Sequence, residues 1–257
     1  MLYESWCDSV RTGEPLKQFW KFTEKVGGRA VIEPGFPDVI RSHYDDMERI
    51  ADDIRELGYP LAAAILAERM PRSVRARSGE LGEILATELV EEEMGYTVPV
   101  RRLRYKDGRE MALRGDDFIG IRTDTEEHLH FLKGESKSRA ILSGATVIEA
   151  RTALARDGGR PTATSLLFVA DRLMEQTDAR RILGRRIRND VAARAAPPSH
   201  IGHMLFTVSG NAPPQALHDD LHAADAVRPH TVVHFWIEDH QAFIQVAYER
   251  ALALGND

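Results

Sequence analysis

Three charged residues near the middle of the chain have the types and spacing that phosphodiester hydrolysis requires. Glu135 and Lys137 follow the apolar segment 128–132, and Asp117 opens an earlier apolar segment, 117–121. Residues two apart in a β-strand point to the same face, so Glu135 and Lys137 lie together. Pairing the two segments as a hairpin brings Asp117 beside them. The set predicts a site that holds a divalent cation and activates water.

Each residue type has a defined use in such chemistry. Asp117 and Glu135 offer the hard oxygen ligands that Mg²⁺ or Mn²⁺ prefers, and the carbonyl of Ser136 is available as a further metal ligand. Lys137 can polarise the attacking water or neutralise charge that develops on the phosphate. Asp116 directly precedes Asp117, and strand alternation lets only one of the two face the cation. We favour Asp117 and keep Asp116 as the alternate.

A second pair of carboxylates lies on a predicted helix nearer the N-terminus. Within the segment 78–83, Glu80 and Glu83 each follow a glycine, and positions three apart share one helix face. A glycine before each carboxylate lets that face approach a backbone or a metal closely. Ser78 is a plausible N-cap, and Glu80 fits a capping role better than Glu83 does. We therefore favour Glu83 for the active site and keep Glu80 as its alternate.

Arginines near these elements are candidates for contacts with DNA phosphates, whose affinity for proteins is largely electrostatic. The candidates are Arg77, before the glutamate helix, Arg139, after the Glu-x-Lys pair, and Arg181 and Arg185, in a basic helical segment. A solvated helix face or a protein contact is an equal alternative for them. The net charge of -6 argues mildly against nucleic acid, although local basic surface matters more than the sum.

Together these motifs resemble the PD-(D/E)xK nuclease superfamily. The order is a Gly-Glu helix, then Gly-Asp-Asp-Phe-Ile-Gly at 115–120, then Phe-Leu-Lys-Gly-Glu-Ser-Lys at 131–137. Within the superfamily it is similar to HamA, the nuclease subunit of the Hachiman anti-phage system, over roughly residues 78–138. The namesake proline before the aspartate is missing here. The resemblance implies an active site built from Asp117, Glu135, Lys137 and Glu83.

The resemblance also implies partners. HamA-like proteins associate with a superfamily 2 helicase, HamB, that restrains the nuclease until aberrant DNA is sensed. We therefore expect a Mg²⁺- or Mn²⁺-dependent deoxyribonuclease, the effector of an anti-phage complex, with DNA and a HamB-like helicase as partners. The chain contains no Gly-x-x-x-x-Gly-Lys-Ser/Thr loop, which agrees with a motor on another chain. The alternatives are a catalytically idle scaffold of this fold and a sequence-specific restriction endonuclease.

The elements that must position these residues indicate an α/β (α+β) fold with a central mixed sheet flanked by helices. We expect helices over 38–57, 59–70, 78–95, 138–155, 165–188 (two helices) and 241–254. Expected strands or extended segments are 96–105, 117–121, 128–132, 203–208 and 231–237. Residues 1–35 read as irregular apart from a possible strand at 30–32, 107–108 as a hairpin turn and 218–222 as a loop.

One domain is expected over 1–257, with an N-terminal helical extension (1–76) and a PD-(D/E)xK restriction-endonuclease-like core (77–257). Cys7 is the one cysteine, which excludes disulfides within the chain and a Cys-rich zinc site. The sequence has no apolar run long enough for a membrane span, so we expect a cytoplasmic protein without membrane contacts. His128 and His130 alternate in a predicted strand, where they could flank the site or be plain surface histidines.

Overall fold

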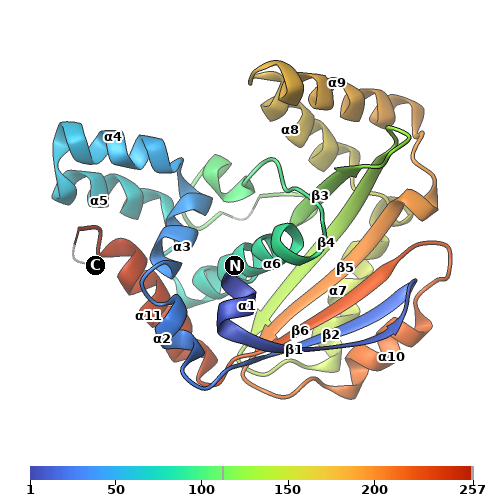
Figure 1. Ribbon diagram of the computed structural model, residues 1–257, viewed down its shortest axis with the longest axis horizontal. Coiled ribbons are helices and arrows are strands. Elements are labelled where there is room, and N and C mark those ends of the chain that lie inside the picture. The colour runs from blue at the N-terminus through green and yellow to red at the C-terminus, as the bar shows by residue number, and fades with distance from the viewer. Residues whose placement is uncertain (112, 256–257) are drawn as a thin grey trace.

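A six-stranded mixed sheet lies at the centre of the computed structural model, which describes residues 1–111 and 113–255 (Figure 1). The strand order is β1-β2-β6-β5-β4-β3. The strands are β1 (Cys7–Glu14), β2 (Lys17–Glu24), β3 (Phe118–Thr123), β4 (Leu129–Arg139), β5 (Ile201–Ser209) and β6 (His230–Trp236). The four inner strands run parallel, and the two edge strands are antiparallel to their neighbours. This confirms the expected mixed sheet.

Helices cover both faces of this sheet. They are α1 (Leu2–Trp6), α2 (Gly28–Ile32), α3 (Phe36–Tyr44), α4 (Met47–Leu57), α5 (Tyr59–Arg69), α6 (Val74–Glu93), α7 (Gly144–Ala155), α8 (Ala163–Met174), α9 (Asp178–Ala193), α10 (Gln215–Ala223) and α11 (His240–Leu252). Short 3-10 turns add η1 (Arg102–Tyr105), η2 (Arg156–Gly159) and η3 (Pro198–His200). None of the described helices is both long and apolar enough to cross a membrane.

Strand β5 shows how the core is divided between the two faces. All nine of its residues are buried, as expected for an inner parallel strand with helices on both sides. Met204 and Phe206 point into the larger core, which includes α6 and α11, whereas Leu205 points into the core formed with α7 and α10. In Figure 1, α6 accordingly lies in front of the sheet and α7 behind it.

A third apolar cluster joins α8 and α9 to the outer end of the sheet. Ile119, Ile121 and Phe131 pack there against Leu166 and Ile187. The two helices form a pair at the top of Figure 1, near the turn that joins β3 and β4. The Glu-x-Lys strand is therefore fixed by α6 and α7 at one end and by the α8–α9 pair at the other.

The expectation that residues 1–35 are irregular, apart from a strand at 30–32, was wrong. Residues 7–24 form the β1–β2 hairpin, and β2 pairs in parallel with β6, so this hairpin extends the central sheet. The segment 30–32, expected as a strand, lies in helix α2. Seven of the eight β1 residues are exposed, and an exposed strand of polar residues has no apolar alternation to reveal it.

Two helix boundaries also differ from expectation. The helix expected over 38–57 is broken at Asp45, where Asp46 starts α4 as an N-cap that accepts the backbone N–H of Glu48 at 3.0 Å. Helix α6 begins at Val74 with Ser73 as its N-cap, so Ser78 lies inside the helix and is not a cap. Its hydroxyl instead bonds that of Ser138 on β4 at 2.9 Å. The capping explanation for Glu80 is thereby excluded.

Three further segments differ. The stretch 96–105 contributes one β-bridge, Thr97 with Ile121, and then the turn η1, and no hairpin forms at 107–108. The helix expected from Ser138 starts at Gly144, because β4 continues to Arg139. Residues 218–222 lie in helix α10 rather than a loop. The expected β3–β4 hairpin, the strands β5 and β6, the pair α8–α9 and the final helix are confirmed in type and approximate position.

Candidate active site

The β3–β4 hairpin brings Asp117 next to the Glu-x-Lys pair. Phe118 pairs with Gly134, and continuing this antiparallel register by one residue places Asp117 opposite Glu135. The Oδ2 atom of Asp117 accepts the backbone N–H of Ser136 at 2.8 Å. Asp117 thus continues the ladder with its side chain just before β3 begins, and this bond holds the carboxylate against β4.

Two glycines allow the close packing on which this arrangement depends. A Cβ at Gly134 would lie 2.0 Å from the ring of Phe118, so only glycine leaves room for that ring. A Cβ at Gly82 of α6 would lie 2.7 Å from the Oγ of Ser136. The glycine before Glu83 therefore lets α6 approach β4 closely, as expected, whereas a Cβ at Gly79 would point into open space.

Lys137 is paired with Glu135 on the face that both share. Its Nζ lies 2.7 Å from Oε1 of Glu135 and 3.2 Å from Oε1 of Glu149, on α7. The contact agrees with the strand alternation that placed the two residues together. The lysine is thus held beside the carboxylates by two anions, one of them buried and the other, Glu149, largely exposed.

Glu83 approaches Asp117 from α6. The two residues line the same small cavity, together with Arg102 and Phe118. Glu83 also lines a larger cavity of about 430 Å³ beside α6. Among the residues that the structure describes, no hydrogen-bond partner of the Glu83 carboxylate is found. It is therefore a carboxylate in a half-buried position with its ligand capacity unused.

The electrostatics of the three carboxylates favour capture of a cation. Burial first, and then the charge of Asp117, raise the pKa of Glu83 well above its usual range and that of Glu135 to about 7. Burial also raises the pKa of Asp117, and the Ser136 N–H and Lys137 oppose it. Like charges in a low-dielectric site repel one another, so a divalent cation among them would relieve an existing strain.

Arg102 is a member of the site that the sequence did not indicate. It is buried in η1, donates from Nη2 to the carbonyl of Arg114 at 2.7 Å, and lowers the pKa of both Glu83 and Asp117 by its charge. Its Nε atom is buried without a hydrogen-bond partner in the described structure. The segment was expected to be extended, and nothing in its spacing distinguished Arg102 from Arg101 or Arg104.

The two alternate carboxylates are engaged elsewhere. Glu80 accepts the hydroxyl of Tyr44 at 2.6 Å and is paired with Lys106. Asp116 is buried and turns to the other side, where it accepts both the backbone N–H (2.7 Å) and the hydroxyl (3.1 Å) of Thr162, the N-cap of α8. Its Oδ1 lies 3.4 Å from Nζ of the buried Lys133. The side chains of Asp116 and Asp117 therefore point to different sides, that of Asp116 toward α8 and that of Asp117 toward β4.

The oxygen atoms of Glu83, Asp117 and Glu135 do not all lie close enough together to bind one metal ion as they stand. In the described part of the chain, the single group of three Asp, Glu or His side chains whose ligand atoms lie within 4.8 Å of one another is Asp124, His130 and His200. The oxygens of Glu83, Asp117 and Glu135 are thus spread more widely, and one oxygen of Glu135 is occupied by Lys137. The residues present fit an oxygen-bound cation in chemistry, and side-chain rotation is needed to close the site around it.

Comparison with known families adds to this geometry. A family model described as HamA matches residues 35–251, which includes every element of the carboxylate site. The chain belongs to the HamA family. A curated relative, the Hachiman protein HamA of Bacillus cereus, is 33% identical over 106 residues. That alignment covers 41% of this chain and 36% of the relative, so the chain spans little more than a third of the curated protein it matches.

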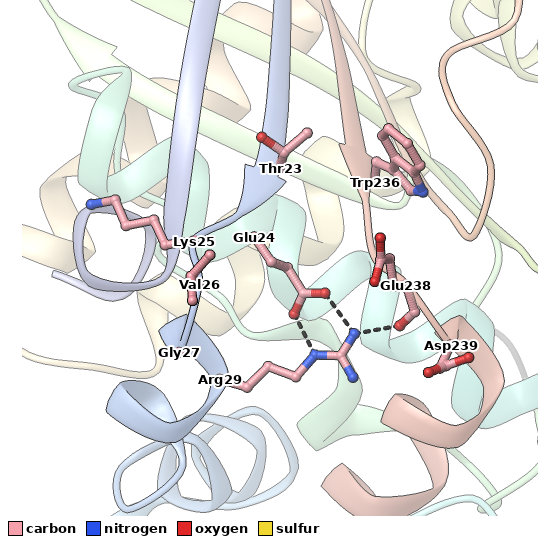
Figure 2. Close-up of a pocket in the computed structure, with 9 residues that line it drawn as sticks. All are labelled: Thr23, Glu24, Lys25, Val26, Gly27, Arg29, Trp236, Glu238 and Asp239. Carbon is pink, nitrogen blue, oxygen red and sulfur yellow. Dashed lines mark hydrogen bonds and ion pairs between the residues drawn. The ribbon is translucent and has the colours of Figure 1, made fainter.

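Within this HamA-family chain, a second cavity of about 430 Å³ lies away from the carboxylates, where β2 and β6 end (Figure 2). Arg29 crosses it and donates to both carboxylate oxygens of Glu24 at 2.5 Å and to the carbonyl of Glu238. Glu24 also accepts the indole N–H of Trp6 at 2.9 Å. Because the half-buried Glu24 is already paired with Arg29 and bonded to Trp6, this cavity resembles a structural joint more than a cation site.

The arginines predicted to contact DNA have different surroundings. Arg181 and Arg185 are exposed on α9, and no ion pair of either is found in the described residues. Arg139 is exposed at the end of β4 and donates to the Ser138 carbonyl at 2.9 Å. Arg77 is half-buried, donates to the Pro71 carbonyl and lies over the ring of Tyr248. Arg77 thus has contacts with two other parts of the fold, whereas Arg139 bonds only to the carbonyl of its neighbour among the described contacts.

We expect Glu135→Gln to stabilise the metal-free protein at alkaline pH. A carboxyl whose pKa rises from 4.5 to about 7 on folding contributes stability below pH 4.5 that is lost as pH increases through 7. Removing the charge should raise the free energy of unfolding by about 2 kcal/mol at pH 8, after discounting the lost Lys137 pair, with little difference at pH 4.5. Urea denaturation in EDTA at both pH values measures this.

A matched control for that measurement is Glu56→Gln, at an exposed position of α4, which should change neither value. Lower stability of Glu135→Gln than wild type at pH 8 would show that the Lys137 ion pair outweighs the desolvation of Glu135.

Proposed function

We propose that this chain is a metal-dependent DNA nuclease that hydrolyses phosphodiester bonds as the effector subunit of a Hachiman anti-phage defence complex. The observation that carries the proposal is the convergence of Asp117, Glu135 and Lys137 at the end of the β3–β4 hairpin, with Glu83 facing Asp117 from α6. Phosphodiester hydrolysis requires hard oxygen ligands for a divalent metal ion and a positive charge beside them. The three carboxylates offer the ligands, and Lys137 offers the charge.

Asp117, Glu135 and Glu83 would hold Mg²⁺ or Mn²⁺. The bound ion supplies Lewis-acid stabilisation of the phosphate and a more acidic water. The Ser136 N–H points toward the end of β3, and in a ladder the N–H and C=O of one residue point to the same neighbour. The Ser136 carbonyl therefore faces the same edge as Asp117, just before the first residue of β3, which supports its role as a further ligand.

Lys137 is positioned to orient the attacking water and to offset charge on the phosphate. Its ion pairs with Glu135 and Glu149 raise its pKa, and this effect outweighs that of burial, so it is a cation at neutral pH. A permanent positive charge suits electrostatic stabilisation of a developing oxyanion. Arg102 would act indirectly, because its positive charge limits the repulsion between Glu83 and Asp117.

Family membership supports the role in defence. The Bacillus cereus relative is by its name a protein of the Hachiman system, and we propose the same system for this chain. We propose a HamB-like superfamily 2 helicase as the controlling partner, since the sequence contains no ATP-binding loop of its own. DNA is the proposed substrate, and the exposed Arg181 and Arg185 offer phosphate contacts on α9.

Cleavage of linear and supercoiled DNA by the purified chain, alone and with its helicase partner, tests the proposal. We expect degradation in Mg²⁺, none in EDTA, and loss of activity in Glu135→Ala and Lys137→Ala. Equal cleavage by wild type and both variants would refute the assignment. An idle scaffold would show metal-independent DNA or helicase binding without cleavage, and a restriction endonuclease would give discrete fragments instead of a smear.

A further inference from the structure

A cluster of histidines lies at the opposite end of β4 from the carboxylate site. Asp124 and His128 belong to the β3–β4 turn, His130 to β4, and His200 to η3, directly before β5. Oδ2 of Asp124 lies 2.9 Å from Nε2 of His130 and 3.4 Å from Nδ1 of His128. Ligand atoms of Asp124, His130 and His200 all lie within 4.8 Å of one another.

The backbone around this cluster holds its side chains in place. Oδ1 of Asp124 accepts the N–H of Glu126 at 3.0 Å and that of His128 at 2.8 Å, so Oδ2 is left to face the histidines. The ring of His200 lies against the rings of His130 and His128, with centroids 4.0 and 5.6 Å away.

The distances suit a small tetrahedral ion. Two ligands of one zinc ion lie about 3.3 Å apart, as follows from bond lengths of roughly 2.0–2.1 Å. The two separations from Oδ2 of Asp124 lie on either side of that value. The His200 ring is stacked on that of His130, with centroids 4.0 Å apart, so it would rotate to join them. His128 is more than half exposed and can adjust freely.

We propose that Asp124, His128, His130 and His200 bind one transition-metal ion of the Zn²⁺ class, at a site separate from the carboxylates. Imidazole-rich sets select Zn²⁺, Co²⁺, Ni²⁺ or Cu²⁺, whereas Mg²⁺ prefers oxygen ligands. His130 and Glu135 are five residues apart on one strand, which corresponds to about 17 Å at roughly 3.3 Å per residue. One ion therefore cannot serve both places.

The site would tie together two segments that are distant in sequence. His200 precedes β5, whereas the other three residues lie on the β3–β4 hairpin at the edge of the sheet. Glu127 of the same turn already contacts Arg186 of α9. Four protein ligands leave no open position, so the ion would act as a structural clamp between the hairpin tip and the segment η3 that leads into β5.

Zinc binding to the metal-stripped, untagged full chain tests this. We expect about one Zn²⁺ per chain by calorimetry, a tetrahedral absorption spectrum with Co²⁺, and a higher Tm in Zn²⁺. His130→Gln with His200→Gln should weaken Zn²⁺ affinity at least about 100-fold, the upper end of what even second-shell changes cost. His222→Gln, an exposed histidine on α10, and Glu135→Gln should bind Zn²⁺ as wild type does.

If the double variant does not fold, Asp124→Asn replaces it, because asparagine retains an oxygen for the Glu126 and His128 N–H groups. The proposal is overturned if the His130→Gln, His200→Gln double variant or Asp124→Asn binds Zn²⁺ as tightly as wild type does. It is also overturned if Glu135→Gln abolishes Zn²⁺ binding. Neither result depends on DNA cleavage, so this site and the nuclease assignment stand or fall separately.

Discussion

Asp117→Asn should reduce Mg²⁺-dependent DNA cleavage by at least about 1,000-fold, equivalent to about 4 kcal/mol of lost transition-state stabilisation. Asparagine retains an oxygen to accept the Ser136 N–H, so the hairpin should keep its shape. It removes the charge that a cation at this position needs. Single-turnover cleavage rates at saturating Mg²⁺ measure the loss.

The stability of Asp117→Asn should not fall. Burial raises the pKa of Asp117, and its charge raises those of Glu83 and Glu135, so the carboxylate is an electrostatic cost in the metal-free fold. Activity within tenfold of wild type would show that the cation is held elsewhere. A folded but inactive Asp117→Asn variant with normal helicase binding would separate catalysis from assembly.

Asp116→Asn should have the opposite phenotype, with a loss of about 3 kcal/mol in the free energy of unfolding. Asp116 is the carboxylate beside the buried Nζ of Lys133, and its removal leaves that ammonium with the carbonyls of Arg156 and Arg160 alone among its described partners. It also weakens the bonds to Thr162 that fix the start of α8. Urea denaturation followed by far-UV circular dichroism measures the change.

The same experiment contains its own check. Lys133→Met combined with Asp116→Asn should recover part of the lost stability, because no charge is then left unpaired in the core. The folded fraction of Asp116→Asn should cleave DNA at a rate within about tenfold of wild type. An inactive but fully stable Asp116→Asn would reverse the roles of the two neighbouring aspartates.

The centre of the fold was predictable because its strands are buried on both faces. The strands β5 and β6 are buried along almost their whole length and contain short apolar runs, residues 204–206 and 232–233, and such runs can be recognised without any alignment. The association of Glu135 with Lys137 followed from strand alternation alone and agrees with their 2.7 Å contact. These conclusions depend on local periodicity, which a single sequence contains.

What the sequence could not show depends on contacts between distant residues. The break at Asp45 arises because this buried aspartate pairs with Arg69 at 3.0 Å, while the apolar period continues across it. Asp116 turns toward Thr162, the N-cap of α8, after a bend in the chain before β3, and strand alternation does not describe such a bend. The recruitment of Arg102 to the carboxylates likewise depends on tertiary packing.

The pairing of β2 with β6 has a consequence for how the protein is made. Lys17 lies beside His230, a partner synthesised more than 200 residues later. Loop closure over such a distance is slow, and a chain folds from its N-terminus as it emerges. The hairpin 7–24 must therefore wait for the last strand, and its edge is a place where a chaperone or a neighbouring chain can bind before synthesis ends.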